Sequence, residues 1–209
     1  MTTPVSEATP QFAGHIDGVE SVVGPRRRPL SASDYEQMAS LGLFEGLRVE
    51  LIDGEIVEMP PIGESHARSV TKTAIRLTVA LHERLLIRSQ NPINAGTLGR
   101  PEPDVVLVPL ESLQVEGPPS QAELVIEVSD STLKYDQTDK ASLYASLGIQ
   151  DYWIINLVEE SLEVRRQPIA RSVARFGFDY ASIQILTRGQ SASPLVAPDV
   201  VLQVQELLP

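Results

Sequence analysis

Hydrophobic and polar positions alternate through residues 48–59, on both sides of the pair Asp53-Gly54. Alternation with a period of two is typical of a strand with one buried face, and Asp-Gly between two such runs indicates a tight hairpin turn. The pattern therefore predicts a β-hairpin. Within it, Leu51 is expected to face the interior and Glu50, on the opposite face, to be exposed to solvent.

Apolar residues at helical spacing predict three helices. The longest spans 65–88, where apolar side chains recur every three or four residues. A short helix over 33–42 is opened by a capping-box pattern and closed by a glycine. The third spans 137–147, with Asp136 as its N-cap and Gly148 as its C-terminal stop.

Short apolar runs bounded by polar or turn residues predict strands beyond the hairpin. The runs are 93–97, 105–108, 124–128, 152–156, 162–166 and 182–186. The order of helix, hairpin, long helix, three strands, helix and further strands is typical of a mixed sheet with helices packed on it. We therefore expect a single α/β domain over residues 30–209.

Residues 1–29 are rich in Pro, Gly, Ser and Thr and show no periodicity. Such a segment buries little apolar surface, so we interpret it as a flexible leader that is dispensable for folding. Its basic run, 26–28, is interpreted as solvated linker in preference to a phosphate contact. The sequence has neither a signal peptide nor an apolar stretch long enough to span a membrane, and no cysteine. These features favour a cytoplasmic protein.

The formal net charge is −11. This charge argues against a protein that coats nucleic acid, because such proteins neutralise phosphates with an excess of Lys and Arg. It is compatible with an enzyme that gathers carboxylates around a cation. A P-loop and a dinucleotide-binding fingerprint are both missing from the sequence, and the three His residues are too scattered to form a zinc set.

Two carboxylates stand in apolar strands. Asp104 begins the run 105–108, and Glu127 lies inside the run 124–128. A carboxylate in a buried strand is costly unless it is paired or bound to a cation, so the two side chains are candidates for a shared Mg²⁺ site. Separately, Asp104 can be interpreted as a turn residue at a strand end and Glu127 as a salt-bridge partner.

Lys140 lies in the middle of the apolar stripe of the third helix, three and four residues before Leu143 and Tyr144. An ammonium there either extends outward to water, pairs with Asp136 one turn earlier, or meets anionic groups inside. The last case would make Lys140 a catalytic amine. Lys134, nearer to Glu127 in sequence, is the competing candidate.

His66 and Glu50 are weaker candidates for the same site. His66 opens the long helix on its apolar face, where a histidine is commonly a hydrogen-bonded structural residue. Glu50 is expected to be exposed, although a role at the site stays open for it.

The candidate residues and their neighbours form a known pattern. Its elements are 50–55, Pro103-Asp104, Glu127-Val128-Ser129, Ser131-Thr132, Asp136, Lys140, Tyr144-Ala145, Gly148-Ile149 and Tyr152-Trp153. In order and spacing they resemble the Uma-two family of predicted endonucleases, part of the PD-(D/E)XK or restriction-endonuclease-like superfamily. The resemblance covers residues 31–207.

The resemblance implies a restriction-endonuclease-like mixed β-sheet flanked by helices. It also implies hydrolysis of DNA phosphodiester bonds with Mg²⁺, for which Mn²⁺ can substitute. Asp104 matches the PD position and Glu127 the acidic residue of the next strand, so both are expected metal ligands. The usual lysine position falls on Ser129. In this family the lysine has moved to the following helix, where it matches Lys140.

Two other functions are consistent with the residues. The acidic charge favours a catalytically silent nucleic-acid-binding or assembly module on the same fold, whereas the intact set of Asp104, Glu127 and Lys140 favours an enzyme. A hydrolase that uses the two carboxylates as acid and base without metal is the third possibility. For an endonuclease with one set of catalytic residues per chain, we expect a homodimer, because cutting a duplex is easiest with two sites related by a twofold axis.

Overall fold

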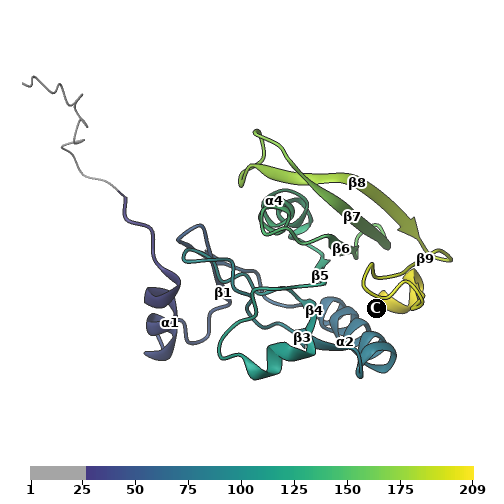
Figure 1. Ribbon diagram of the computed structural model, residues 1–209, viewed down its shortest axis with the longest axis horizontal. Coiled ribbons are helices and arrows are strands. Elements are labelled where there is room, and N and C mark those ends of the chain that lie inside the picture. The colour runs from purple at the N-terminus through teal and green to yellow at the C-terminus, as the bar shows by residue number, and fades with distance from the viewer. Residues whose placement is uncertain (1–26) are drawn as a thin grey trace, which may run out of the picture.

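The computed structural model describes residues 27–209, so most of the expected leader, residues 1–26, lies outside the described residues. A six-stranded mixed sheet forms the centre of the fold (Figure 1). Its strands, in spatial order, are β3 (Leu85–Ser89), β4 (Val105–Pro109), β5 (Leu124–Ser129), β6 (Asp151–Asn156), β7 (Ser161–Ala170) and β8 (Phe178–Thr187). All neighbours are antiparallel except β5 and β6, which are parallel. The predicted fold class is confirmed.

Helices cover both faces of this sheet. Helix α2 (Glu64–Leu81) and the short α5 (Val204–Leu207) pack on one face, and α4 (Ala141–Ser146) packs on the other (Figure 1). Alternate residues of β4 and β5 enter the two cores, which is why their sequences are nearly continuous apolar runs. A polar side chain inside either strand is therefore buried whichever way it points.

The predicted hairpin is confirmed as β1 (Val49–Ile52) and β2 (Glu55–Glu58). Asp53 and Gly54 have φ angles of 54° and 75°, the positive values that a two-residue hairpin turn of this kind requires. Helix α1 (Ala32–Ser40) precedes the hairpin, and its capping box uses Ser31 and Asp34, two residues earlier than predicted.

The expectation that Glu50 is exposed is wrong, because its exposed fraction is 4%. Alternation indicates exposure only where one face of a strand meets water. Here both faces of β1 are covered. Val49 and Leu51 pack with α1, while Glu50 points to Lys140 on the other side.

The long helix is shorter than its periodicity predicts. It begins after Gly63 and ends at Leu81, and residues 85–89 form the edge strand β3. Leu85 continues the helical spacing of Leu77 and Leu81, but it reaches the same apolar core from the strand. Spacing alone cannot distinguish these two arrangements.

The predicted strand at 93–97 is also wrong. Its backbone N–H groups donate to carbonyls of three separate loop residues, Pro101, Pro119 and Gly99, so no continuous ladder forms. The remaining short elements are a 3₁₀ helix at Leu110–Gln114 and a two-stranded sheet of β9 (Ser191–Ala192) and β10 (Leu202–Gln203).

The third helix begins earlier than predicted. Its turns run continuously through α3 (Leu133–Tyr135), a π-helical turn at Asp136–Lys140 and α4. Asp136 is therefore a buried residue within the helical run and not its N-cap. The predicted stop is correct, since Gly148 follows α4 with a φ of 75°. None of the helices in the described part of the chain has the length and apolar character needed to cross a bilayer.

The N-terminal boundary can be tested by truncation. Leu30 donates its N–H to the carbonyl of Gly54, and Pro29 packs against the same turn. A chain that begins at residue 27 should melt within a few degrees of the full chain, as expected if the leader buries little surface. A chain that begins at Ala32 should melt lower, because it loses these contacts with the hairpin. Calorimetry measures both, and a large loss in the first variant would show that residues 1–26 stabilise the fold.

Candidate active site

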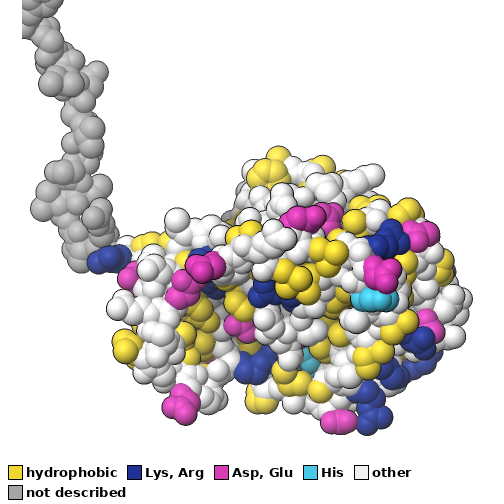
Figure 2. All heavy atoms as spheres, turned by 60° about the horizontal axis from the view of Figure 1, so that its bottom comes forward, with side chains coloured by type: hydrophobic (Ala, Val, Ile, Leu, Met, Phe, Trp, Pro, Cys, Tyr) yellow, Lys and Arg dark blue, Asp and Glu magenta, His cyan; other side chains and the backbone are white. Residues whose placement is uncertain are grey.

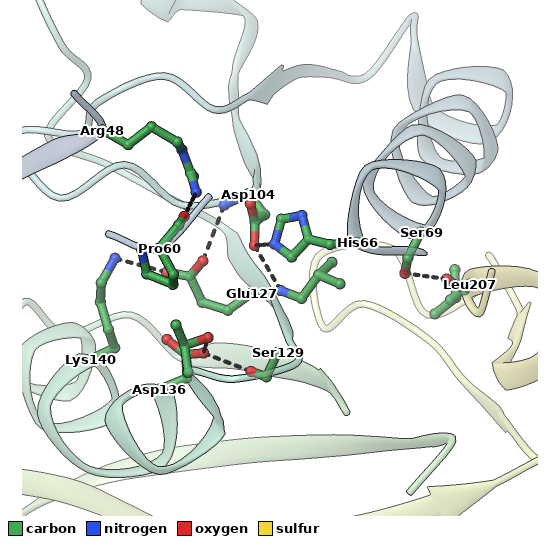
Figure 3. A network of polar contacts seen from close by, with 12 residues as sticks. Arg48, Pro60, His66, Ser69, Asp104, Glu127, Ser129, Asp136, Lys140 and Leu207 are labelled. Atoms are coloured by element: carbon green, nitrogen blue, oxygen red, sulfur yellow. Dashed lines mark hydrogen bonds and ion pairs between the residues drawn. The ribbon is translucent and has the colours of Figure 1, made fainter. Parts of the chain in front are cut away.

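Asp104 and Glu127 stand opposite each other on neighbouring strands. The β4–β5 register pairs Val105 with Ile126, which places Asp104 beside Glu127 at the start of β4. The N–H of Asp104 donates to Glu127 Oε2 at 3.2 Å, and the N–H of Val128 donates to Asp104 Oδ2 at 2.9 Å (Figure 3). The backbone pairing of two buried strands thus fixes both carboxylates toward the same place.

The Lys140 side chain reaches this pair from the helical run that packs on the sheet (Figure 3). Its ammonium lies 2.7 Å from Glu50 Oε2, 3.0 Å from Glu50 Oε1 and 3.1 Å from Glu127 Oε1. The exposed fraction of Lys140 is 1%, so the alternative in which it extends to water is wrong. Its ion pairs also go to the two glutamates and not to Asp136, the other alternative.

His66 joins the site from the first turn of α2, with its Nε2 3.0 Å from Asp104 Oδ2. A carboxylate oxygen can only accept, so Nε2 carries the proton while Asp104 is ionised. The other ring nitrogen, Nδ1, is buried and has no hydrogen-bond partner among the described residues. His66 and the N–H of Val128 thus contact the same oxygen of Asp104, Oδ2.

Burial dominates the electrostatics of Glu127. It raises the pKa of this carboxyl to about 8, with the charges of Asp104, Asp136 and Glu50 acting in the same direction and Lys140 opposing them. Tyr144 supports the ionised form, because its hydroxyl donates to Glu127 Oε1 at 2.7 Å. The ionised form of Glu127 is thus favoured by the nearby ammonium of Lys140 and the hydroxyl of Tyr144, and it is opposed by burial.

Lys140 and Tyr144 both keep their protons. Burial acts against the charge on Lys140, but the adjacent Glu127 and Glu50 outweigh it and raise its pKa well above the ordinary value. Burial and Glu127 likewise raise the pKa of Tyr144. Both groups are therefore fixed hydrogen-bond donors, and Lys140 is not suited to act as a general base.

Asp136 is a further buried carboxylate at this site. Its Oδ2 accepts from the hydroxyls of Ser129 and Thr132, each at 2.7 Å. Ser129 is the position where the superfamily pattern usually has its lysine. In this chain the hydroxyl of Ser129 instead anchors the start of the π-helical turn that carries Lys140.

A small cleft of about 60 Å³ opens onto the two carboxylates. Its charged lining residues, other than His66, are Arg48, Glu50, Glu102, Asp104, Glu127, Asp130 and Asp136. About 10–15 Å³ of volume on this measure is enough for one water molecule, so the cleft has room for a cation with several of its waters.

The donor set fits a hard cation that keeps waters. No three His, Cys, Asp or Glu side chains within residues 27–209 converge as a ready protein cage, which a structural zinc site would need. Mg²⁺ commonly takes one or two carboxylates and completes its shell with water. Asp104 and Glu127 supply those carboxylates, and each retains lone pairs beyond the hydrogen bonds it accepts.

Comparison with known proteins identifies the family. The sequence model of the Uma2 (Uma-two) family, described as "Putative restriction endonuclease", matches residues 32–205. The chain belongs to the Uma2 family. The resemblance noted in the sequence is thereby confirmed.

A solved structure shares the fold of this Uma2 chain. It is described as "a putative nuclease belonging to DUF820" from Anabaena variabilis, and it superimposes with a TM-score of 0.65 over 86% of this chain and 97% of its own. The sequence identity is 14%, so this likeness concerns the fold. No curated protein matches the sequence significantly.

Three features of the candidate site are not predicted from the sequence. They are the burial of Glu50, the hydrogen bond from Tyr144 to Glu127, and the burial of Asp136 beside Ser129. Tyr144 carried a detectable signal, since it lies four residues after Lys140 and therefore on the same helical face. Asp136 lies four residues before Lys140 and carries the same signal, which the prediction of an N-cap at this position overlooks. Glu50 offered none, because its burial depends on how the hairpin packs.

Proposed function

We propose that this Uma2 protein is a Mg²⁺-dependent endonuclease that hydrolyses DNA phosphodiester bonds, with Mn²⁺ as a substitute metal. The observation that carries the proposal is the placement of Asp104 opposite Glu127 at a small acidic cleft, with the ammonium of Lys140 behind Glu127. Family membership supports a nuclease activity, and the geometry supports a site of the metal-assisted kind.

Asp104 and Glu127 would hold the ion, and His66 would orient Asp104 through its Nε2. When bound, Mg²⁺ supplies a Lewis acid and lowers the pKa of its water. The chain's own contribution is to present two carboxylates at fixed positions in a small acidic cleft. Such preorganised charges need no rearrangement at the moment of reaction.

Lys140 would act as a fixed positive charge. It lies behind Glu127 and holds this side chain, together with Tyr144, in one orientation. Its ammonium also compensates part of the negative charge of Glu50 and Glu127 when no metal is bound. In this arrangement the positive charge of Lys140 stabilises the ionised carboxylate of Glu127. Lys140 keeps its proton, so a different group must accept the proton of the attacking water.

Nicking of supercoiled plasmid tests the proposal. The full chain should convert the plasmid to open circles with Mg²⁺ or Mn²⁺ and should do nothing in excess chelator. Cleavage that survives chelation would support the acid–base hydrolase that needs no metal. A protein that binds DNA but cleaves neither DNA nor RNA with any divalent cation would support the silent module.

One observation favours the silent module. The cleft has six lining carboxylates (Glu50, Glu102, Asp104, Glu127, Asp130 and Asp136) in a chain of net charge −11, which opposes the approach of a phosphate. A productive nuclease must offset this repulsion. A bound metal would supply one part of the offset, and a cation of the protein at the cleft would supply another.

A further inference from the structure

We propose that Arg48 is the residue that binds a phosphate of the nucleic acid at the mouth of the cleft. This inference rests on the proposed nuclease function and assigns the substrate contact of the same site. Arg48 comes immediately before β1 and is exposed. Its Nη1 donates to the carbonyl of Pro60 at 2.8 Å, which directs the guanidinium along the rim of the cleft (Figure 3).

The guanidinium of Arg48 has no carboxylate at ion-pair distance among the described residues, although its charge acts to lower the pKa of Glu102, which burial raises. Most arginines of the described chain form ion pairs with carboxylates, and Arg48 forms none with the described residues. The paired arginines are Arg68, Arg76, Arg84, Arg100, Arg165, Arg166, Arg171, Arg175 and Arg188. Arg27, Arg28 and Arg88 also lack an ion pair with the described residues, but of these four arginines only Arg48 lines the candidate active site.

Arg48 is also the single Lys or Arg among the described residues that line the cleft. Lys140 is not a lining residue, and its ammonium is already bound by Glu50 and Glu127. On the face seen in Figure 2, basic side chains form one small group at the lower right and otherwise lie among acidic ones. A single well-placed cation therefore matters more here than on a protein with a broad basic surface.

The chemistry of the guanidinium suits a phosphate. Arginine presents five N–H donors in a planar fork that matches two phosphate oxygens. The bond to Pro60 uses Nη1, and Nε and Nη2 donate to no described residue. The same bond restricts the side chain before any substrate arrives, which lowers the entropy cost of binding.

The alternative role for Arg48 is structural. Pro60 belongs to the segment that joins β2 to α2, and the hydrogen bond could serve only to hold that segment near the cleft. Two substitutions separate the roles. Arg48→Gln removes the charge, and its amide nitrogen ends at the position of Nε, so the Pro60 contact is weakened too. Arg48→Lys keeps the charge and has the longer reach, so the salt slope separates a charge contact from a structural tie.

The test measures binding of a labelled DNA duplex by fluorescence anisotropy, with Ca²⁺ in place of Mg²⁺, between about 50 and 200 mM salt. Loss of one phosphate contact lowers the slope of log K against log salt by about 0.9. We expect that change in Arg48→Gln, with affinity weaker by roughly tenfold or more at low salt. Arg48→Lys should keep the slope. In cleavage with Mg²⁺, Arg48→Gln should raise KM more than it lowers kcat.

Arg84→Gln is the matched control. It removes one exposed positive charge that lies beyond the end of α2, and the helix from His66 to Leu81 is roughly 22 Å long. It should bind DNA with the wild-type slope. Melting temperatures of all variants show that each is folded.

Each result decides between the proposals. An Arg48→Gln variant with wild-type slope and affinity, beside a wild type that binds and cleaves, overturns the role of Arg48 alone. If both Arg48 variants bind more weakly with an unchanged slope, Arg48 acts by holding the segment around Pro60 in place. That result also overturns the proposed phosphate contact. A wild type that neither binds nor cleaves DNA overturns the nuclease proposal and this inference together.

Discussion

Asp104→Asn should lower Mg²⁺-dependent cleavage by more than about a hundredfold and leave the fold intact. Losing a group that only supports a metal ligand already costs about 10–100-fold in affinity or activity, and Asp104 is itself the proposed ligand. The asparagine carbonyl can still accept from the N–H of Val128 and from His66, so both contacts of Oδ2 survive.

The same substitution should not destabilise the metal-free protein. Asp104 is 6% exposed, and its charge is one of the groups that raise the pKa of Glu127. Removing that charge relieves repulsion between two buried carboxylates. We expect the melting temperature without metal to equal or exceed that of the wild type, as measured by calorimetry.

The matched control for Asp104→Asn is Glu64→Gln. Glu64 lies two residues before His66 in α2, but it is exposed, pairs with Arg68 and does not line the cleft. It should keep wild-type cleavage and Mg²⁺ affinity. A metal-free Asp104→Asn protein that melts far below the wild type would show that Asp104 is a structural residue.

Much of this geometry follows from the sequence because buried strands limit what a carboxylate can do. Asp104 and Glu127 stand out as charges in apolar runs, and one antiparallel register brings them together. The helical stripe places Lys140 inside by the same reasoning. A local pattern is sufficient to show that each charge is buried, because the apolar neighbours that create the constraint lie within a few positions. The pairing of β4 with β5 joins residues 23 positions apart and comes from the fold.

The parts that could not be predicted depend on packing between distant segments. Glu50 belongs to a hairpin whose local pattern indicates exposure, and its partner Lys140 lies 90 residues later. Leu85 fits a helix and a strand equally well until its neighbours are known. The π-helical turn at Asp136–Lys140 has no sequence signal that separates it from an ordinary helix.

Lys140→Met should lower cleavage by roughly a hundredfold or more, as when one donor that stabilises transition-state charge is lost. The methionine keeps most of the stem and its packing. The structure adds a cost that the sequence did not reveal. Without the ammonium, Glu50 and Glu127 remain buried with no counter-charge, which typically destabilises a protein by about 3–5 kcal/mol.

This cost has a predictable dependence on pH. Burial holds the pKa of Glu127 at about 8 against an ordinary 4.5, and Lys140 is the nearby charge that lowers it. In Lys140→Met the pKa rises further. A carboxyl with a raised pKa in the folded state loses stability as pH increases above its unfolded value. Between about pH 4.5 and 8 both proteins lose stability with the same slope, because in both the folded state keeps Glu127 protonated while the unfolded state does not. The stability deficit of the variant should therefore grow as pH rises above about 8, where only the wild type ionises Glu127, and denaturation at several pH values measures it.

A double variant separates the loss of stability from the loss of catalysis. Lys140→Met with Glu50→Gln removes one of the two stranded charges and should recover part of the stability. Its cleavage should stay low if the lysine charge is required, and plasmid nicking under conditions where every variant is folded measures this. Recovery of wild-type nicking in the double variant would show that Lys140 only compensates Glu50.

Lys134→Met provides the comparison that decides which lysine acts. Lys134 is exposed in α3 and is not among the residues that line the cleft. Its removal leaves no buried carboxylate without a partner, so nicking and stability should both match the wild type.

Normal nicking by Lys140→Met with none by Lys134→Met would reassign the role to Lys134. Normal nicking by both would contradict any mechanism in which a lysine assists. We expect the reverse, with nicking lost in Lys140→Met and kept in Lys134→Met, because the ammonium of Lys140 directly contacts Glu50 and the proposed metal ligand Glu127.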